Sequence, residues 1–122
     1  MGYPESWFGS VGLGGGAGPA GSFGVAHTLT ISGGIAAKDS SHKNILLAGA
    51  GGADDSLDRI TGYAEGDMLI ISPSDDAVTI TVVDSVGMNL QGVDFVMNDI
   101  NDSMILLNQG GDTWKELSRS AN

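Results

Sequence analysis

The chain has 122 residues, with fifteen Asp and Glu against five Lys and Arg, a formal net charge of −10 at pH 7, and no cysteine. This length suits one small domain, and the acidic balance opposes the phosphate contacts that nucleic-acid binding requires. The lack of cysteine excludes disulfides and thiol nucleophiles, and no apolar run reaches the roughly 20 residues of a membrane-spanning helix, so no membrane partner is expected.

Residues 1–26 form a glycine-rich segment without helical or strand periodicity. Such a segment loses much backbone entropy on ordering and buries little within itself, so we expect an extended arm that is held by a partner. Aromatic side chains are the preferred anchors of such contacts. The expected partner-binding anchors are Tyr3, Trp7, Phe8 and Phe23. Glycine at every third position from Gly9 to Gly24 leaves a triple strand of three chains as an alternative.

From Thr28 onward, apolar and polar residues alternate with period two, which predicts strands with one buried face. No segment has the pattern of a helix, so residues 27–122 are predicted to be one β domain. The expected strands are 28–32, 44–48, 57–61, 68–72, 77–84, 88–91, 94–98, 103–108 and 113–118. The residues expected to pack in the core or at a trimer contact are Val78, Ile80, Val82, Phe95, Leu106 and Trp114.

Turn-forming residues separate these strands, so strand starts recur about every 9 to 12 residues. This spacing suits a sandwich, a barrel, or short rungs in a solenoid or prism. The pairs Leu46-Leu47, Ile70-Ile71 and Leu106-Leu107 place apolar side chains on both faces of their strands. A single small sheet cannot cover both faces, so we expect another subunit to cover the second one.

Few residues have the setting of a catalytic group. His27 and His42 lie in glycine, serine or lysine contexts without a nucleophile motif. The Asp clusters are interpreted as turn acids, and the loop that begins at Asp99 has methionine where a calcium-binding EF-hand needs glycine. We therefore expect no enzyme activity, no catalytic residue, no cofactor and no metal. An acid pair for sugar cleavage, such as Asp75 with Asp94, is the open alternative.

The C-terminal half of the chain resembles a module found in virion proteins of tailed bacteriophages, such as fibres, spikes and capsid decoration proteins. The resemblance rests on an ordered series of short segments rather than on any single one. These segments are 57–62 (LDRITG), 65–71 (EGDMLII), 78–82 (VTITV), 87–90 (GMNL), 94–97 (DFVM), 102–107 (DSMILL) and 113–119 (TWKELSR).

The resemblance implies a homotrimer of interlocked β-structure, with short antiparallel strands in a prism-like or sandwich-like domain. It also implies a place on the capsid surface of a virion that is assembled in the host cytoplasm. The first hypothesis is a capsid decoration, or cement, protein whose partners are its own copies and the major capsid protein. The alternative is a tail or head fibre or a spike tip that binds a host receptor or glycan.

Overall fold

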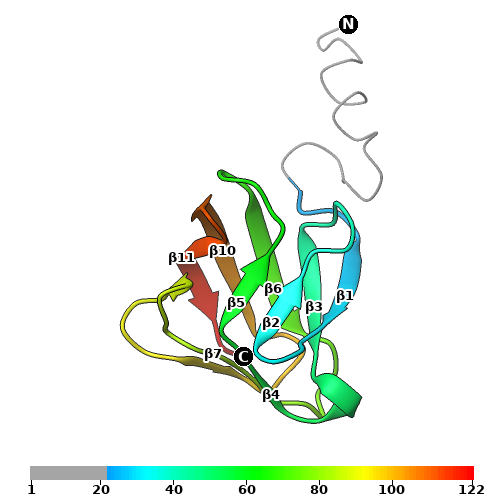
Figure 1. Ribbon diagram of the computed structural model, residues 1–122. Coiled ribbons are helices and arrows are strands. Elements are labelled where there is room, and N and C mark those ends of the chain that lie inside the picture. Colours follow the sequence, from blue (N-terminus) through cyan, green and yellow to red (C-terminus); the bar gives the residue numbers. More distant parts are fainter. Residues whose placement is uncertain (1–21) are drawn as a thin grey trace, which may run out of the picture.

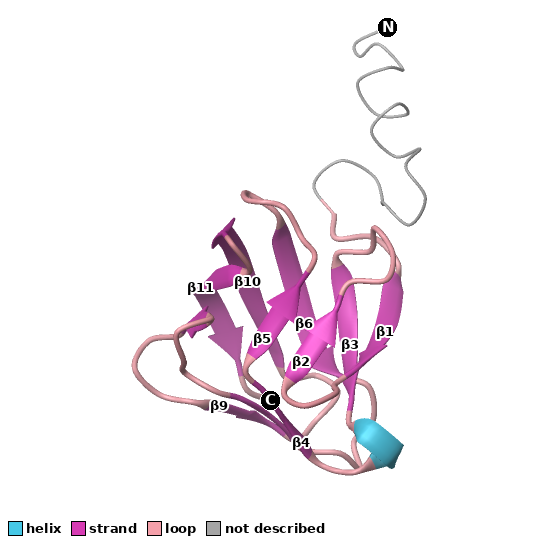
Figure 2. Cartoon of the chain, viewed as in Figure 1, coloured by secondary structure: helices cyan, strands magenta, loops and turns pink. Residues whose placement is uncertain are grey.

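The computed structural model describes residues 22–122. Tyr3, Trp7, Phe8 and the glycine triplets before residue 22 therefore lie outside the described residues. In the described part the chain forms strands and a single 3₁₀ turn, η2, as Figure 2 shows, which confirms the all-β prediction. The elements are β1 Ala26–Thr30, β2 Ile35–Ala37, β3 Asn44–Ala48, η2 Ala50–Gly52, β4 Asp55–Leu57, β5 Arg59–Thr61, β6 Met68–Pro73, β7 Ile80–Val82, β8 Met88–Asn89, β9 Phe95–Met97, β10 Ser103–Gly110 and β11 Thr113–Ser120.

Parallel stacking of successive chain turns builds most of the domain. Strands β1, β3 and β6 lie side by side in parallel, and β2–β5 and β4–β7 form parallel pairs on two further faces. Figure 1 shows β2 and β5 in front of β1, β3 and β6. The register places apolar residues in rows, with Leu29 beside Leu47 and Ile45 beside Ile71. The result is a short β-solenoid, one of the architectures that the strand spacing left open.

Antiparallel strands complete the opposite end of the main sheet. Strand β10 pairs antiparallel with both β6 and β11, and β9 pairs antiparallel with β7, whereas β8 runs parallel to β11. The six-stranded sheet therefore has the order β1-β3-β6-β10-β11-β8. Among the eight strand pairs of residues 22–122, five are parallel and three antiparallel.

The prediction of short antiparallel strands is thus wrong for the stacked part of the domain. Period-two alternation reports which face is buried, and it carries no information on strand direction. Parallel neighbours need a long crossover, and residues 31–43 and 49–67 supply these crossovers while also contributing β2, β4 and β5.

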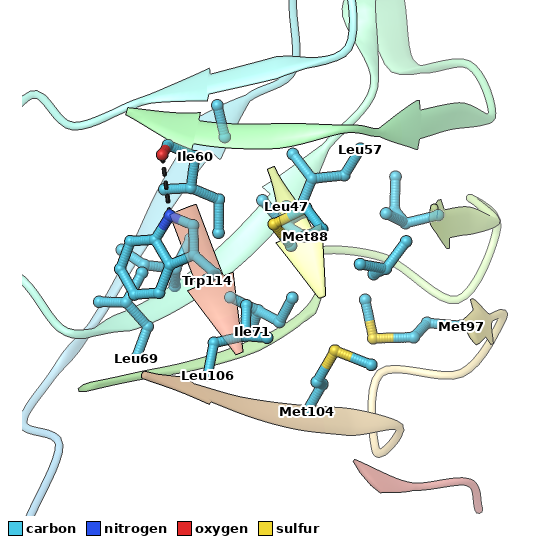
Figure 3. Packing of buried hydrophobic residues seen from close by; sticks show 14 of the residues in the cluster. Leu47, Leu57, Ile60, Leu69, Ile71, Met88, Met97, Met104, Leu106 and Trp114 are labelled. Atoms are coloured by element: carbon cyan, nitrogen blue, oxygen red, sulfur yellow. Dashed lines mark hydrogen bonds between the residues drawn. The ribbon is translucent and has the colours of Figure 1, made fainter. Parts of the chain in front are cut away.

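The core lies inside the wrapped strands, where apolar side chains from all the faces meet (Figure 3). Trp114 is fully buried in this core. Its indole Nε1–H donates a hydrogen bond of 2.9 Å to the carbonyl oxygen of Ile60, and its ring meets that of Tyr63 edge-on at a centroid distance of 5.8 Å. A buried indole needs such an acceptor, so this bond joins β11 to β5 across the interior.

Candidate functional site

Most acidic side chains are engaged by the backbone of turns. Of the fourteen acidic residues in the described part, eleven accept a hydrogen bond from a backbone N–H. These residues are Asp54, Asp55, Asp67, Asp75, Asp76, Asp84, Asp94, Asp99, Asp102, Asp112 and Glu116. Within residues 22–122, no three His, Asp or Glu side chains lie close enough together to hold a metal ion. The clustered acids therefore act as local caps that fix turn geometry.

The two histidines, far apart in the sequence, stack on each other with ring centroids 4.6 Å apart. His27 Nε2 lies 2.7 Å from Asp39 Oδ1, and His42 Nδ1 lies 2.7 Å from Ser40 Oγ. The carboxylate thus contacts one histidine and the hydroxyl the other, so the four groups do not form a Ser–His–Asp relay. The cluster instead fastens the turn before β3 to β1.

Tyr63 secures the same turn from inside. Its hydroxyl donates a hydrogen bond of 2.8 Å to the carbonyl oxygen of His42. Burial, together with the negative charges of Asp39 and Asp67, raises the pKa of Tyr63 to about 12. The phenol is therefore a neutral donor throughout the physiological pH range.

Asp67 closes the turn before β6. It accepts hydrogen bonds from the backbone N–H of Ala64, at 2.9 Å, and from Lys43 Nζ, at 3.1 Å. Burial alone would raise the pKa of this carboxyl, but these two donors and the positive charge of Lys43 hold it below its ordinary value. The ion pair thus joins the segment before β3 to the start of β6.

The buried carboxylate of Glu116 forms an ion pair with Arg119 within β11. It accepts hydrogen bonds from Arg119 Nε at 2.5 Å and from the backbone N–H of Gln91 at 3.1 Å. The Arg119 hydrogen bond, aided by the Gln91 N–H, lowers the pKa of Glu116 in spite of its burial. Arg119 also lies over the ring of Phe95, at 4.8 Å from its centroid, and donates to the carbonyl oxygen of Val93. This group holds the 90–95 loop against the C-terminal strand.

The largest unexplained feature is the outward side of the six-stranded sheet. Side chains alternate across a strand, so every second residue of β1, β3, β6 and β10 points away from the core. These outward positions, hereafter the outer face, are Ala26, Thr28, Thr30, Asn44, Leu46, Ala48, Met68, Ile70, Ser72, Ser103, Ile105, Leu107 and Gln109. None of them is acidic, although acidic residues outnumber basic ones three to one in the chain.

Apolar residues gather at the middle of the outer face. Ile105 lies directly opposite Ile70, and Leu107 lies opposite Met68 in the β10–β6 register. Ile70, Ile105 and Leu107 are half-buried, and Met68 is 41% exposed. A contiguous apolar surface of this kind marks a contact with another molecule more often than a scattering of single residues does.

The six residues predicted for core or trimer packing all lie inside the single chain. Val78, Ile80, Val82, Phe95, Leu106 and Trp114 are at most 5% exposed. They are therefore not accessible to a second subunit, and the outer face carries a different set of apolar side chains. The doubled apolar pairs had indicated Leu46, Ile70 and Leu107, whereas Ile105 was missed because its neighbours Met104 and Leu106 are apolar as well.

Phe23 is the one predicted arm anchor within the described residues. It is half-buried and borders an open cavity of about 340 Å³ that Lys43, Asp67 and Met68 also line. Asn44 Nδ2 donates a hydrogen bond of 3.1 Å to the carbonyl oxygen of Gly24 beside it. The root of the N-terminal segment is thus attached next to the exposed edge of Met68.

No protein-family model matches the chain, and no curated protein shows significant sequence similarity to it. In residues 22–122, no helix has the length and apolar character needed to cross a membrane.

Proposed function

We propose that this chain is a virion structural protein, namely a homotrimeric capsid decoration protein that binds and stabilises an assembled phage capsid. The observation that supports its self-assembly is the apolar outer face, which is free of carboxylates in a chain of net charge −10. The place in a virion follows from the resemblance of the C-terminal half to phage virion modules.

The charge distribution makes the outer face the most favourable surface for contact between identical chains. Copies of a strongly acidic protein repel each other, and a carboxylate that is buried without a partner is costly. The outer face avoids both penalties, because its polar positions are uncharged Ser, Thr, Asn and Gln. Burying Leu46, Met68, Ile70, Ile105 and Leu107 would contribute roughly 25 cal/mol for each Å² of apolar area.

Three copies can place these faces around a common axis, which closes the assembly and leaves no free apolar patch. A trimer that binds only the assembled shell stabilises that shell by mass action, in proportion to its occupancy. No chemical step is needed. The acidic turns would then face solvent or a basic surface of the major capsid protein.

The test compares two outer-face variants with a matched control. Ile70→Asp and Ile105→Asp place a carboxylate in the proposed contact, whereas Val96→Asp changes an apolar residue that is 51% exposed on the three-stranded sheet. In light scattering after size exclusion, we expect the unaltered chain and Val96→Asp to have the mass of three chains. The two outer-face variants should have the mass of one chain and keep their β-sheet circular dichroism.

A monomeric unaltered chain, or trimeric Ile70→Asp and Ile105→Asp variants, would contradict the proposed assembly. Binding to the shell is tested by adding the purified protein to undecorated particles and measuring the copies bound per particle. Occupancy over the whole shell supports decoration. Attachment only at a tail or a single vertex would indicate the fibre or spike tip instead.

A further inference from the structure

A groove of about 470 Å³ lies away from the outer face, where β2 and β5 meet the 85–87 loop. Ile35 and Arg59 are neighbours in the β2–β5 register, and both line the groove together with Val86. Ile35 is 40% exposed and Val86 is 90% exposed. The groove therefore combines apolar and charged side chains.

Two charged side chains, those of Asp58 and Arg59, line the groove. Neither the Asp58 carboxylate nor the Arg59 guanidinium takes part in a hydrogen bond or ion pair within the described part of the chain. Elsewhere in that part, Lys43 pairs with Asp67 and Arg119 with Glu116. An unpaired, half-buried guanidinium in such an acidic chain is a ready site for an incoming carboxylate.

The backbone of Gly87 lies close to this guanidinium. A Cβ atom added at Gly87 would lie 2.7 Å from Arg59 Nε, so a larger residue at position 87 would displace the arginine side chain. Adjacent charges of opposite sign suit an extended peptide, because Arg59 can donate to a carboxylate and Asp58 can accept from a backbone N–H.

The N-terminal segment of the chain carries the complementary chemistry. Glu5 is the only charged side chain before Lys38, and it is followed closely by Trp7 and Phe8. Sixteen residues separate Glu5 from Ser22, and an extended chain of that length spans roughly 50 Å. This exceeds the diameter of about 35 Å expected for a 100-residue domain. The segment is therefore long enough to reach the groove on its own chain or on an adjacent copy.

We infer that residues 3–8 dock in this groove, with the Glu5 carboxylate on the Arg59 guanidinium and the aromatic side chains against Ile35 and Val86. This assigns the arm anchors Tyr3, Trp7 and Phe8 to a site on this chain, where the sequence had indicated a separate partner. The inference does not depend on the proposed function, since a monomer could also dock its own segment.

The first experiment measures cleavage of the full-length chain by chymotrypsin after Trp7 and Phe8. Losing a charge-assisted hydrogen bond favours the open, cleavable form on the order of tenfold. We therefore expect cleavage of Arg59→Gln to be about tenfold faster, with no change in Lys115→Gln, which removes an exposed cation on the opposite sheet. Combining Glu5→Arg with Arg59→Glu should restore slow cleavage. Equal cleavage in all four proteins would overturn the inference.

A second experiment traps the contact directly, since the chain has no cysteine of its own. Ser6→Cys combined with Val86→Cys should form a disulfide on mild oxidation, and the mass of the non-reduced product shows whether it joins one chain or two. Either product supports docking. Ser6→Cys with Val96→Cys is the control at an exposed position outside the groove. No disulfide at Val86, or equal yields at both positions, would contradict docking whatever the oligomeric state.

Discussion

Both sides of the six-stranded sheet carry large apolar residues, but only those on the inner side are fully buried. Ile70 and Ile71 are adjacent residues of β6, yet Ile71 is fully buried while Ile70 lies half-buried on the outer face. The same holds for Leu107 and Leu106 in β10. Folding of a single chain therefore buries the inner apolar side chains only. The outer apolar side chains remain partly exposed to water, and association with another molecule would bury them.

The largest effect is expected inside the solenoid, at Ile80. Ile80→Asp places an unpaired charge at a fully buried position and should lower the free energy of unfolding by more than about 4 kcal/mol. Ile80→Val, which keeps the position apolar, should lower it by only about 1 kcal/mol. Urea denaturation followed by circular dichroism distinguishes the two. A stable Ile80→Asp protein would show that the inner side is not a closed core.

The neighbouring isoleucines Ile70 and Ile71 of β6 directly test the difference between the two sides of the sheet. Ile71→Ala leaves a cavity and should lower the free energy of unfolding by about 3 kcal/mol. Ile70→Ala should change it by less than about 1 kcal/mol in a dilute, dissociated sample, because its side chain is already partly hydrated. Equal losses in thermal or urea denaturation would mean that a single chain already buries both faces.

Glu116 is an exception on the inner side, since it is charged and buried. Glu116→Gln weakens its bonds to Arg119 and Gln91, so we expect a loss of about 2 kcal/mol at pH 7. The folded-state pKa of Glu116 lies below the ordinary 4.5. Its stabilisation is therefore present above that ordinary value and is lost as the pH falls through the lower folded-state pKa.

Urea denaturation of both proteins from pH 7 to pH 2 measures this contribution. The difference between the unaltered chain and Glu116→Gln should shrink as the pH falls through that range. A difference that stays constant down to pH 2 would show that the carboxylate charge contributes nothing to stability.

The smallest expected effect is that of Tyr63→Phe, which removes only the hydrogen bond to the carbonyl oxygen of His42. We expect a loss of about 1 kcal/mol. The loss should not vary between pH 6 and pH 9, because the pKa of Tyr63 is about 12 and the phenol stays neutral. Thermal melts at these two pH values provide the measurement, and a larger loss at pH 9 would contradict it.

Alternation was sufficient to locate strands, because it follows from burial on one side. Each expected strand overlaps at least one strand of the domain, and the expected segment 57–61 spans the end of β4 and all of β5. The sequence did not indicate β2, whose residues Ile35–Ala37 follow two glycines and are too few to show a period. The alternation of apolar and polar residues also could not predict strand direction, because the long crossovers have the sequence of ordinary loops.

The functional surfaces were less accessible to prediction than the strands. The doubled apolar pairs indicated that the sheet has a second apolar side. That this side carries no Asp or Glu is evident only from the pairing of β1, β3, β6 and β10 in one sheet. The groove at Arg59 joins residues from three separate segments, which only the folded chain brings together. Asp58 had no feature in the sequence that set it apart from the many turn acids.

The closed and open ends of the solenoid give the molecule a direction of growth. The β10–β11 hairpin occupies the end beyond β6, while β1 forms the other edge of the sheet with its second side unpaired by any described strand. A further strand could therefore pair with the free edge of β1. A tandem copy of residues 26–43 inserted at that point should add one strand to the six-stranded sheet and one to the β2–β5 sheet, and leave the C-terminal end unchanged.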